Sequence, residues 1–74
     1  MDWSLYCDGP ARTEYRAERN GYVAMAYRDN YDGTFGFAVT AGGWFTANVG
    51  TYVRPESWEI AKAQAEHEID LRSV

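Results

Sequence analysis

The side chains that could do chemistry are few, and they match no catalytic or metal-binding pattern. The chain of 74 residues holds one cysteine, Cys7, and one histidine, His67. A structural zinc site needs about four such ligands. A nucleophilic pair of Cys7 and His67 has no supporting motif around either residue. We therefore predict a protein that is not an enzyme and that uses no metal and no cofactor.

The loop around Asp29, Asn30 and Asp32 has the composition of a calcium-binding loop. The ligand spacing of an EF-hand and its closing glutamate are missing, so turn formation explains these residues better. The glycines of the chain match neither nucleotide-binding fingerprint. Tyr31, at the tip of this loop, is a candidate contact residue.

The charge balance excludes a second class of function. Seven basic residues face 11 acidic ones, which gives a net charge of -4. Binding to a phosphate backbone needs clustered cations, so direct nucleic-acid binding is not expected. A single cysteine fits a reducing compartment. No apolar run reaches membrane-spanning length, and the first residues lack a basic and an apolar region, so we expect no signal peptide. We therefore expect a cytoplasmic protein that makes no membrane contact.

The elements that must position these side chains begin with strands. Alternation of apolar and polar residues predicts strands over 3–7, 12–19, 22–28, 34–40 and 44–53. Asn20-Gly21 is the strongest hairpin signal, because both residue types tolerate positive φ. A short helix over 11–19 is the alternative, since alanine, arginine and glutamate favour helix. Short connections favour an antiparallel meander.

A helix is expected after Pro55, with Ser57 as its cap and an end near Leu71. At 100° per residue, one side gathers Trp58, Ala61, Ala65 and Ile69, and Ile60, Gln64 and Leu71 widen it. The predicted fold is a single α+β domain over residues 1–74. It consists of an antiparallel β-meander of four to five strands, with one C-terminal helix packed on one face.

The helix should cover one face of this sheet and leave the other open. The covered face is predicted to carry Val23, Met25, Tyr27, Phe35, Phe37, Val39, Phe45 and Val49. The open face is predicted to carry Tyr15 or Arg16, Tyr22, Ala24, Ala26, Gly36, Ala38, Trp44, Thr46, Asn48 and Tyr52. Tyrosine and tryptophan on a flat surface are typical of interface anchors.

Three acids of the helix, Glu59, Glu66 and Asp70, fall together on the wheel and form a predicted acidic ridge. Such a ridge either is simply solvated or docks on a basic groove of a partner. The predicted partner-binding residues combine the ridge with the exposed aromatics: Glu59, Glu66, Asp70, Tyr22, Tyr31, Trp44 and Tyr52.

Two resemblances follow from these segments. The stretch Ser57-Trp58-Glu59-Ile60-Ala61-Lys62-Ala63-Gln64-Ala65 after a meander resembles part of the double-stranded-RNA-binding domain. Glu56 and Glu59 stand where that family has lysines, so only its fold is implied.

The whole chain also resembles the small acidic anti-CRISPR proteins of phages and mobile elements, through its length, its acidic helix and its aromatic residues. That resemblance implies an inhibitor in the host cytoplasm, which binds a bacterial CRISPR effector complex and blocks DNA binding or nuclease recruitment. The alternatives are an accessory phage protein that oligomerises through its sheet face, as a homodimer for example, and a nucleic-acid-binding module. The latter would use hairpin arginines Arg12, Arg16, Arg19 and Arg28.

Overall fold

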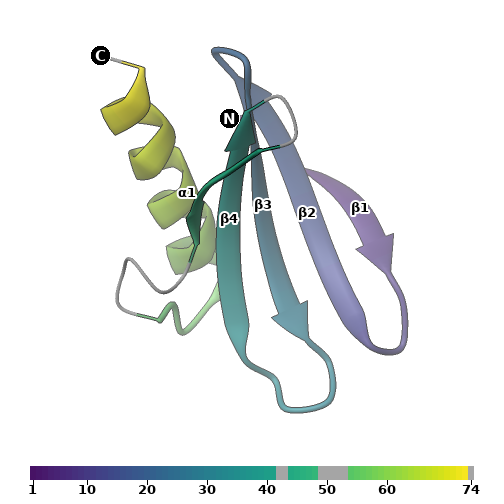
Figure 1. Ribbon diagram of the computed structural model, residues 1–74. Coiled ribbons are helices and arrows are strands. Elements are labelled where there is room, and N and C mark those ends of the chain that lie inside the picture. The colour runs from purple at the N-terminus through teal and green to yellow at the C-terminus, as the bar shows by residue number, and fades with distance from the viewer. Residues whose placement is uncertain (42–43, 49–53, 74) are drawn as a thin grey trace.

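The computed structural model describes residues 1–41, 44–48 and 54–73, and for residues 44–48 it describes the backbone alone. Within these residues the strands are β1 (Ser4–Asp8), β2 (Arg12–Arg19), β3 (Tyr22–Asp29), β4 (Phe35–Ala41) and β5 (Trp44–Asn48). They form one antiparallel sheet in the order β1-β2-β3-β4-β5. The helix α1 (Trp58–Arg72) packs on one side of that sheet, against β3 and β4 (Figure 1). The predicted α+β meander with one packed helix is confirmed.

The turn between β2 and β3 is the two-residue hairpin that the sequence predicts. Asn20 has a φ of 56° and Gly21 a φ of 82°, and Arg19 pairs directly with Tyr22. Positive φ at both central residues matches the twist of the flanking strands. Residues 12–19 are therefore a strand, and the helical alternative for this segment is wrong.

The helix begins where its cap predicts. The backbone N–H of Ile60 donates to the Ser57 hydroxyl at 3.2 Å, which satisfies one of the donors left open at a helix start. Glu59 lies in the first turn and Arg72 in the last, where each charge suits the helix dipole. These contacts stabilise the two ends of α1.

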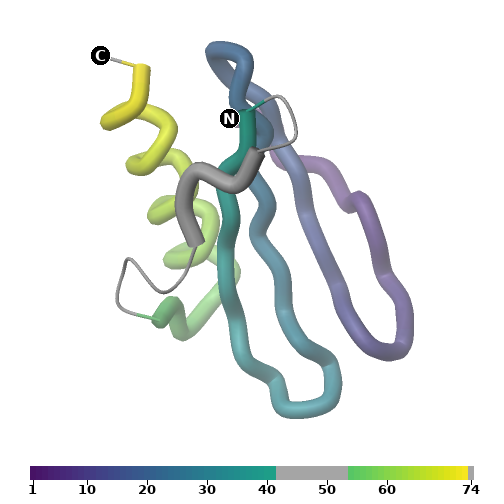
Figure 2. Tube along the Cα trace, in the orientation of Figure 1, coloured from purple at the N-terminus to yellow at the C-terminus, as the bar shows by residue number. Residues whose placement is uncertain are grey.

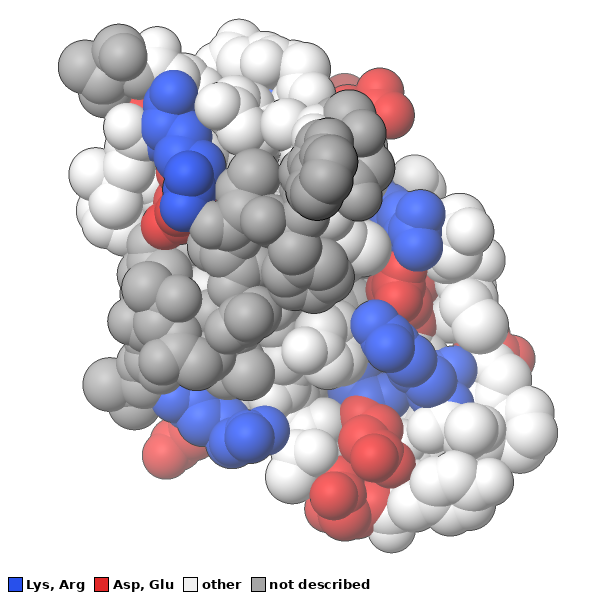
Figure 3. Space-filling view, viewed as in Figure 1, with Lys and Arg blue, Asp and Glu red and all other residues white. Residues whose placement is uncertain are grey.

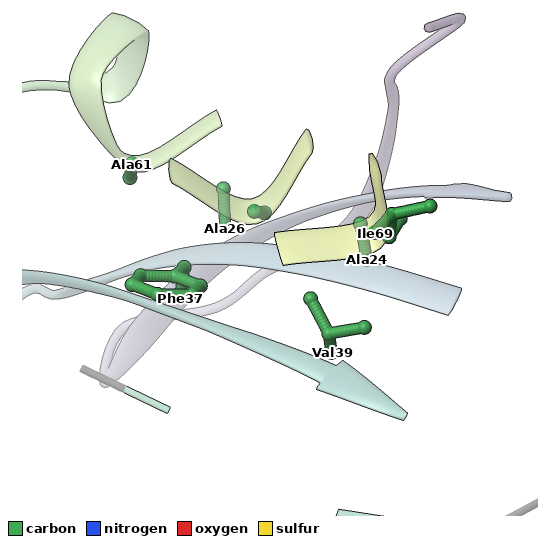
Figure 4. Packing of buried hydrophobic residues seen from close by; sticks show 7 residues of the cluster. Ala24, Ala26, Phe37, Val39, Ala61 and Ile69 are labelled. Atoms are coloured by element: carbon green, nitrogen blue, oxygen red, sulfur yellow. The ribbon is translucent and has the colours of Figure 1, made fainter. Parts of the chain in front are cut away.

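The core lies between α1 and the two strands beneath it. It consists of Ala24 and Ala26 on β3, Phe37 and Val39 on β4, and Ala61, Ala65 and Ile69 on α1. Figure 4 shows Ala61 and Ile69 of the helix facing these strand residues. Alanines on both sides keep the helix close to the sheet. At one end Trp58 packs edge-on against Tyr15 and Phe35, with ring centroids 5.0 and 5.2 Å apart.

The predicted face of β3 is wrong by one residue. Ala24 and Ala26 lie under the helix, opposite Val39 and Phe37, so Val23, Met25 and Tyr27 lie on the other face. Both sets of β3 side chains are apolar, and the larger set was assigned to the core. For β4 the prediction is confirmed, with Phe37 and Val39 covered. Phe45 and Val49 lie outside the residues whose side chains are described.

The remaining corrections concern α1 and β1. Ile60 and Leu71, which were expected to widen the covered side of the helix, are exposed by 42% and 57%. The first strand starts at Ser4, and all five of its residues are exposed, Cys7 among them. The pairing of β1 with β2 slips by one residue between Leu5 and Cys7, which leaves a β-bulge at Tyr6.

Candidate protein-binding surface

The predicted partner-binding residues do not form one site. Tyr31 is 82% exposed in the β3–β4 loop, and Glu59 is exposed in the first turn of α1. Tyr22 lies where β3 meets the helix end, and its hydroxyl donates to the Arg72 carbonyl at 3.4 Å. The side chain of Trp44 and the whole of Tyr52 lie outside the described part of the chain.

Two acids of the ridge attach the helix to the rest of the protein. The indole N–H of Trp3 donates to Oε2 of Glu66 at 2.8 Å, and the Met1 ammonium lies 3.9 Å from the same oxygen. Asp70 forms an ion pair with Arg19 on β2. These contacts place Glu66 and Asp70 along the seam between helix and sheet. Of the three ridge residues, Glu59 is the one for which the described residues provide no ion pair.

A different cluster, which sequence reasoning missed, covers the sheet face that points away from α1. We call it the tyrosine–arginine row: Tyr6, Arg16, Glu14, Arg12 and Tyr27. The Glu14 carboxylate lies 2.7 Å from the Arg12 guanidinium and 2.6 Å from that of Arg16. Arg16 stacks on the Tyr6 ring at 3.5 Å and Arg12 on the Tyr27 ring at 4.1 Å. The signal in the sequence was the alternate spacing of residues 12, 14 and 16 on one strand.

Burial of Glu14 explains why the row is ordered. Glu14 is only 5% exposed, and a buried carboxylate must be paired. One oxygen accepts a hydrogen bond from Nε of Arg16 and the other forms the ion pair with Arg12, so both guanidinium groups are held over the sheet. Arg16 stacks on the Tyr6 ring at one end of the row, and Arg12 stacks on the Tyr27 ring at the other end.

Gly36 fixes the position of Tyr27. These two residues pair across β3 and β4. A Cβ atom at position 36 would lie 2.6 Å from Cζ of Tyr27 and 2.7 Å from its hydroxyl oxygen. Only glycine lets the ring lie this close to the sheet.

Two shallow hollows lie at the ends of the row. The Tyr6 hollow, of about 380 Å³, is lined by Asp2, Ser4, Tyr6, Arg16, Ala17, Glu18 and Val23. The Tyr31 hollow, of about 280 Å³, is lined by Ala11, Arg12, Tyr27, Asp29 and Tyr31. The strand register places Arg16, Glu18 and Val23 on the open face, and likewise Arg12, Tyr27 and Asp29. Both hollows therefore open on the side of the sheet opposite α1.

Asn30 positions the Tyr31 hollow. Its backbone N–H donates to the Ala11 carbonyl at 2.9 Å, and its side-chain amide donates to Gly9 at 3.0 Å and to Thr13 at 2.9 Å. The β3–β4 loop is thereby fastened to the β1–β2 turn, and Figure 2 shows the two connections side by side at the lower end. This brings Tyr31 next to Ala11.

Asp32 stabilises the same loop. Its carboxylate accepts from the Thr34 hydroxyl at 2.7 Å and from the Thr34 backbone N–H at 2.9 Å. These two hydrogen bonds lower the pKa of Asp32 below its usual value, and the bond from the Thr34 hydroxyl has the larger effect. The calcium-like composition of the loop is explained by these turn contacts.

The hairpin arginines do not present a free cationic patch. Arg12 and Arg16 share Glu14, Arg19 pairs with Asp70, and Nε of Arg28 donates to the Asn30 side-chain oxygen at 3.0 Å. Figure 3 shows basic and acidic side chains interleaved over the strands. Carboxylates therefore interrupt the guanidinium groups of this surface, which weakens the attraction for a phosphate backbone.

Neither a metal-binding cluster nor a membrane-spanning helix is found among residues 1–41, 44–48 and 54–73. Among them, no three histidine, cysteine or acidic side chains lie close enough together to hold a metal ion. The helix found there is too short and too polar to span a membrane. Comparison of the chain with protein-family models, curated proteins and solved structures found no match.

Proposed function

We propose that this protein is a non-enzymatic binding domain whose open sheet face docks on another protein. Within that class, we propose an inhibitor that occupies a surface of a bacterial defence complex, a CRISPR effector, and blocks its DNA binding or nuclease recruitment. The proposal combines the family resemblance of the sequence with the surface described above. A net charge of -4 suits a partner with a basic groove, because opposite charge speeds encounter.

The observation that carries the proposal is the tyrosine–arginine row. Tyrosine and arginine are enriched among the residues that dominate binding energy, and a few such residues carry most of it. Here Tyr6 is 60% exposed and Tyr31 82% exposed, each beside a hollow. Arg12 and Arg16 are already held by Glu14, so they lose little freedom on binding.

A second candidate is self-association through the same side of the molecule. Tyr6 on β1 and Tyr31 in the β3–β4 loop, each beside a hollow of the open face, are both exposed by more than half. Exposed tyrosines of this kind are typical interface anchors, so the open face can pack against that of a second copy. Sedimentation of the purified protein over a range of concentrations tests this alternative, since the fraction of dimer would increase with protein concentration.

The test of the main proposal is an inhibition assay. Purified CRISPR effector complexes of several types cut a labelled DNA target while the protein is titrated in. We expect cutting by one type to stop near equimolar protein. The double variant Tyr6→Ala, Tyr31→Ala should need at least about tenfold more protein.

The matched control is Leu71→Ala, which removes an exposed apolar side chain from the outer side of α1. This variant should inhibit like the original protein. Failure to inhibit any effector type would refute the defence-complex assignment. Equal loss in the control would refute the open face as the binding surface.

A further inference from the structure

We propose that the open face recognises two side chains of its partner, a basic one in the Tyr6 hollow and an aromatic one in the Tyr31 hollow. This inference rests on the proposed function and specifies the chemistry of the partner. Arg12 and Arg16, one beside each hollow, are four residues apart on β2. The two side chains should therefore be about 13 Å apart, the length of four extended residues.

The Tyr6 hollow selects positive charge. Its lining carries the carboxylates of Asp2 and Glu18, both exposed, and the described residues provide neither with an ion pair. The one cation in the lining, Arg16, shares Glu14 with Arg12, so it leaves at most one positive charge against these two carboxylates. The remaining local charge is negative, so a lysine or arginine from the partner is the complementary group.

Tyr6 strengthens that selection. Tyr6 is 60% exposed and lines the same hollow as the two carboxylates, with Arg16 stacked on its ring at 3.5 Å. The exposed part of such a ring attracts a cation as well as the apolar stem that carries it.

The Tyr31 hollow selects a ring. Both of its charged groups are already engaged: Arg12 with Glu14, and Asp29 as the acceptor from the Tyr31 backbone N–H at 2.8 Å. What remains of the lining is the exposed Tyr31, Ala11 and the part of the Tyr27 ring that Arg12 leaves uncovered. Aromatic side chains stack favourably against such walls.

Because the two hollows differ in chemistry, a bound segment has one direction. A segment that entered in reverse would place its cation on the tyrosine pair and its ring between two carboxylates. The open face would therefore set the orientation of the partner as well as its identity.

Synthetic peptides of five residues test this inference. The first has arginine at one end, tryptophan at the other and glycine and serine between them. The second has glutamate in place of arginine, and the third has glycine in place of tryptophan. Backbone amide shifts of the full-length protein are followed by NMR during each titration. We expect the first peptide to move the amides of Glu18 and Tyr31 saturably, and the other two to bind at least about tenfold more weakly.

Charge reversal on the protein provides the second arm. The double variant Asp2→Lys, Glu18→Lys should prefer the glutamate peptide over the arginine peptide. The matched control Glu56→Lys, Glu59→Lys makes the same change in net charge at the start of α1, and it should keep the original preference. Urea denaturation confirms that both variants fold.

The inference is overturned if no peptide moves the open-face amides saturably, or if the control also reverses its preference. Such a failure is distinguishable from failure of the proposed function. Loss of effector inhibition in Tyr6→Ala, Tyr31→Ala without any peptide preference would leave the docking face in place and remove its two-residue specificity. Peptide preference without effector inhibition would remove the defence-complex assignment alone.

Discussion

Replacing Gly36 by alanine tests whether the open face depends on the close contact between the Tyr27 ring and the sheet. The new methyl group would lie 2.6 Å from Cζ of Tyr27 and 2.7 Å from its Cε1 and Oη atoms. Ordinary contacts between such atoms are about 3.5–4.0 Å, so the ring must move outward by about 1 Å. That movement separates Tyr27 from the sheet and disturbs its stacking with Arg12.

The magnitude follows from two opposing effects. Overpacking costs about 1–3 kcal/mol of folding free energy. Replacing glycine by alanine where the backbone allows it returns about 0.4–1 kcal/mol by restricting the unfolded chain. Gly36 has no positive φ, so this gain applies. We expect a net destabilisation of about 1 kcal/mol, which corresponds to about 4–8 °C in Tm for a domain of this size.

A double-mutant cycle with Tyr27→Ala isolates the cause. In the Tyr27→Ala background the ring is gone, and Gly36→Ala should stabilise the protein by about 0.5 kcal/mol. Urea unfolding of all four proteins should therefore give a coupling of about 1–3 kcal/mol. Additive effects within about 0.3 kcal/mol would refute the close approach of ring and sheet.

Three further outcomes are expected. Gly21→Val puts a β-branched residue at a φ of 82° and should lower the unfolding free energy by at least about 1 kcal/mol, measured in urea. Ile69→Ala empties a fully buried position and should cost about 2–5 kcal/mol in the same assay. Thr34→Val removes the hydroxyl that lowers the pKa of Asp32, so an NMR titration should find that pKa closer to its ordinary value. Since the folded pKa is lowered, Asp32 stabilises the fold above its unfolded pKa of about 3.9, and this stabilisation is lost as pH falls through the folded value.

Each of these outcomes has a control. An Asn20→Gly variant keeps positive φ available and should retain the hairpin, so equal losses in it and in Gly21→Val would contradict the turn assignment. Ile60→Ala, on the outer side of α1, should change stability by less than about 0.5 kcal/mol. A similar loss at both isoleucines would contradict the packing of the helix. An unchanged Asp32 pKa in Thr34→Val would mean that the backbone N–H alone lowers it.

The elements of the fold were predictable because each has a local signal. Asn20-Gly21 determines the hairpin, and Ser57 after Pro55 determines the helix start. The face of β3 was not predictable, because Val23, Met25 and Tyr27 are as apolar as the alternating alanines. The choice depends on the helix, whose Ala61 and Ala65 need small partners at close range. The covered face of β3 therefore depends on how the strand and the helix pack together, which the pattern of the strand alone does not contain.

The candidate site was less predictable than the fold. The wheel grouped Glu59, Glu66 and Asp70 correctly in angle, but charge on a helix does not reveal its partners. Two of the three acids bond to residues far away in the sequence. Glu66 bonds to Trp3, which is 63 residues away, and Asp70 bonds to Arg19, which is 51 residues away. The row around Glu14 depends in the same way on contacts between strands.

The bulge in β1 has a consequence for the protein in concentrated solution. At Tyr6 the strand carries one residue more than its neighbour, so its outward backbone groups lose the even repeat that another strand would match. A regular strand laid beside β1 could bond on one side of Tyr6 and would fall out of step on the other. Open sheet edges of this length otherwise invite stacking into fibrils, and an interrupted edge is one way in which natural sheets avoid it. The extra residue at Tyr6 therefore disfavours the addition of a further strand at β1, which should limit aggregation through this edge at high protein concentration.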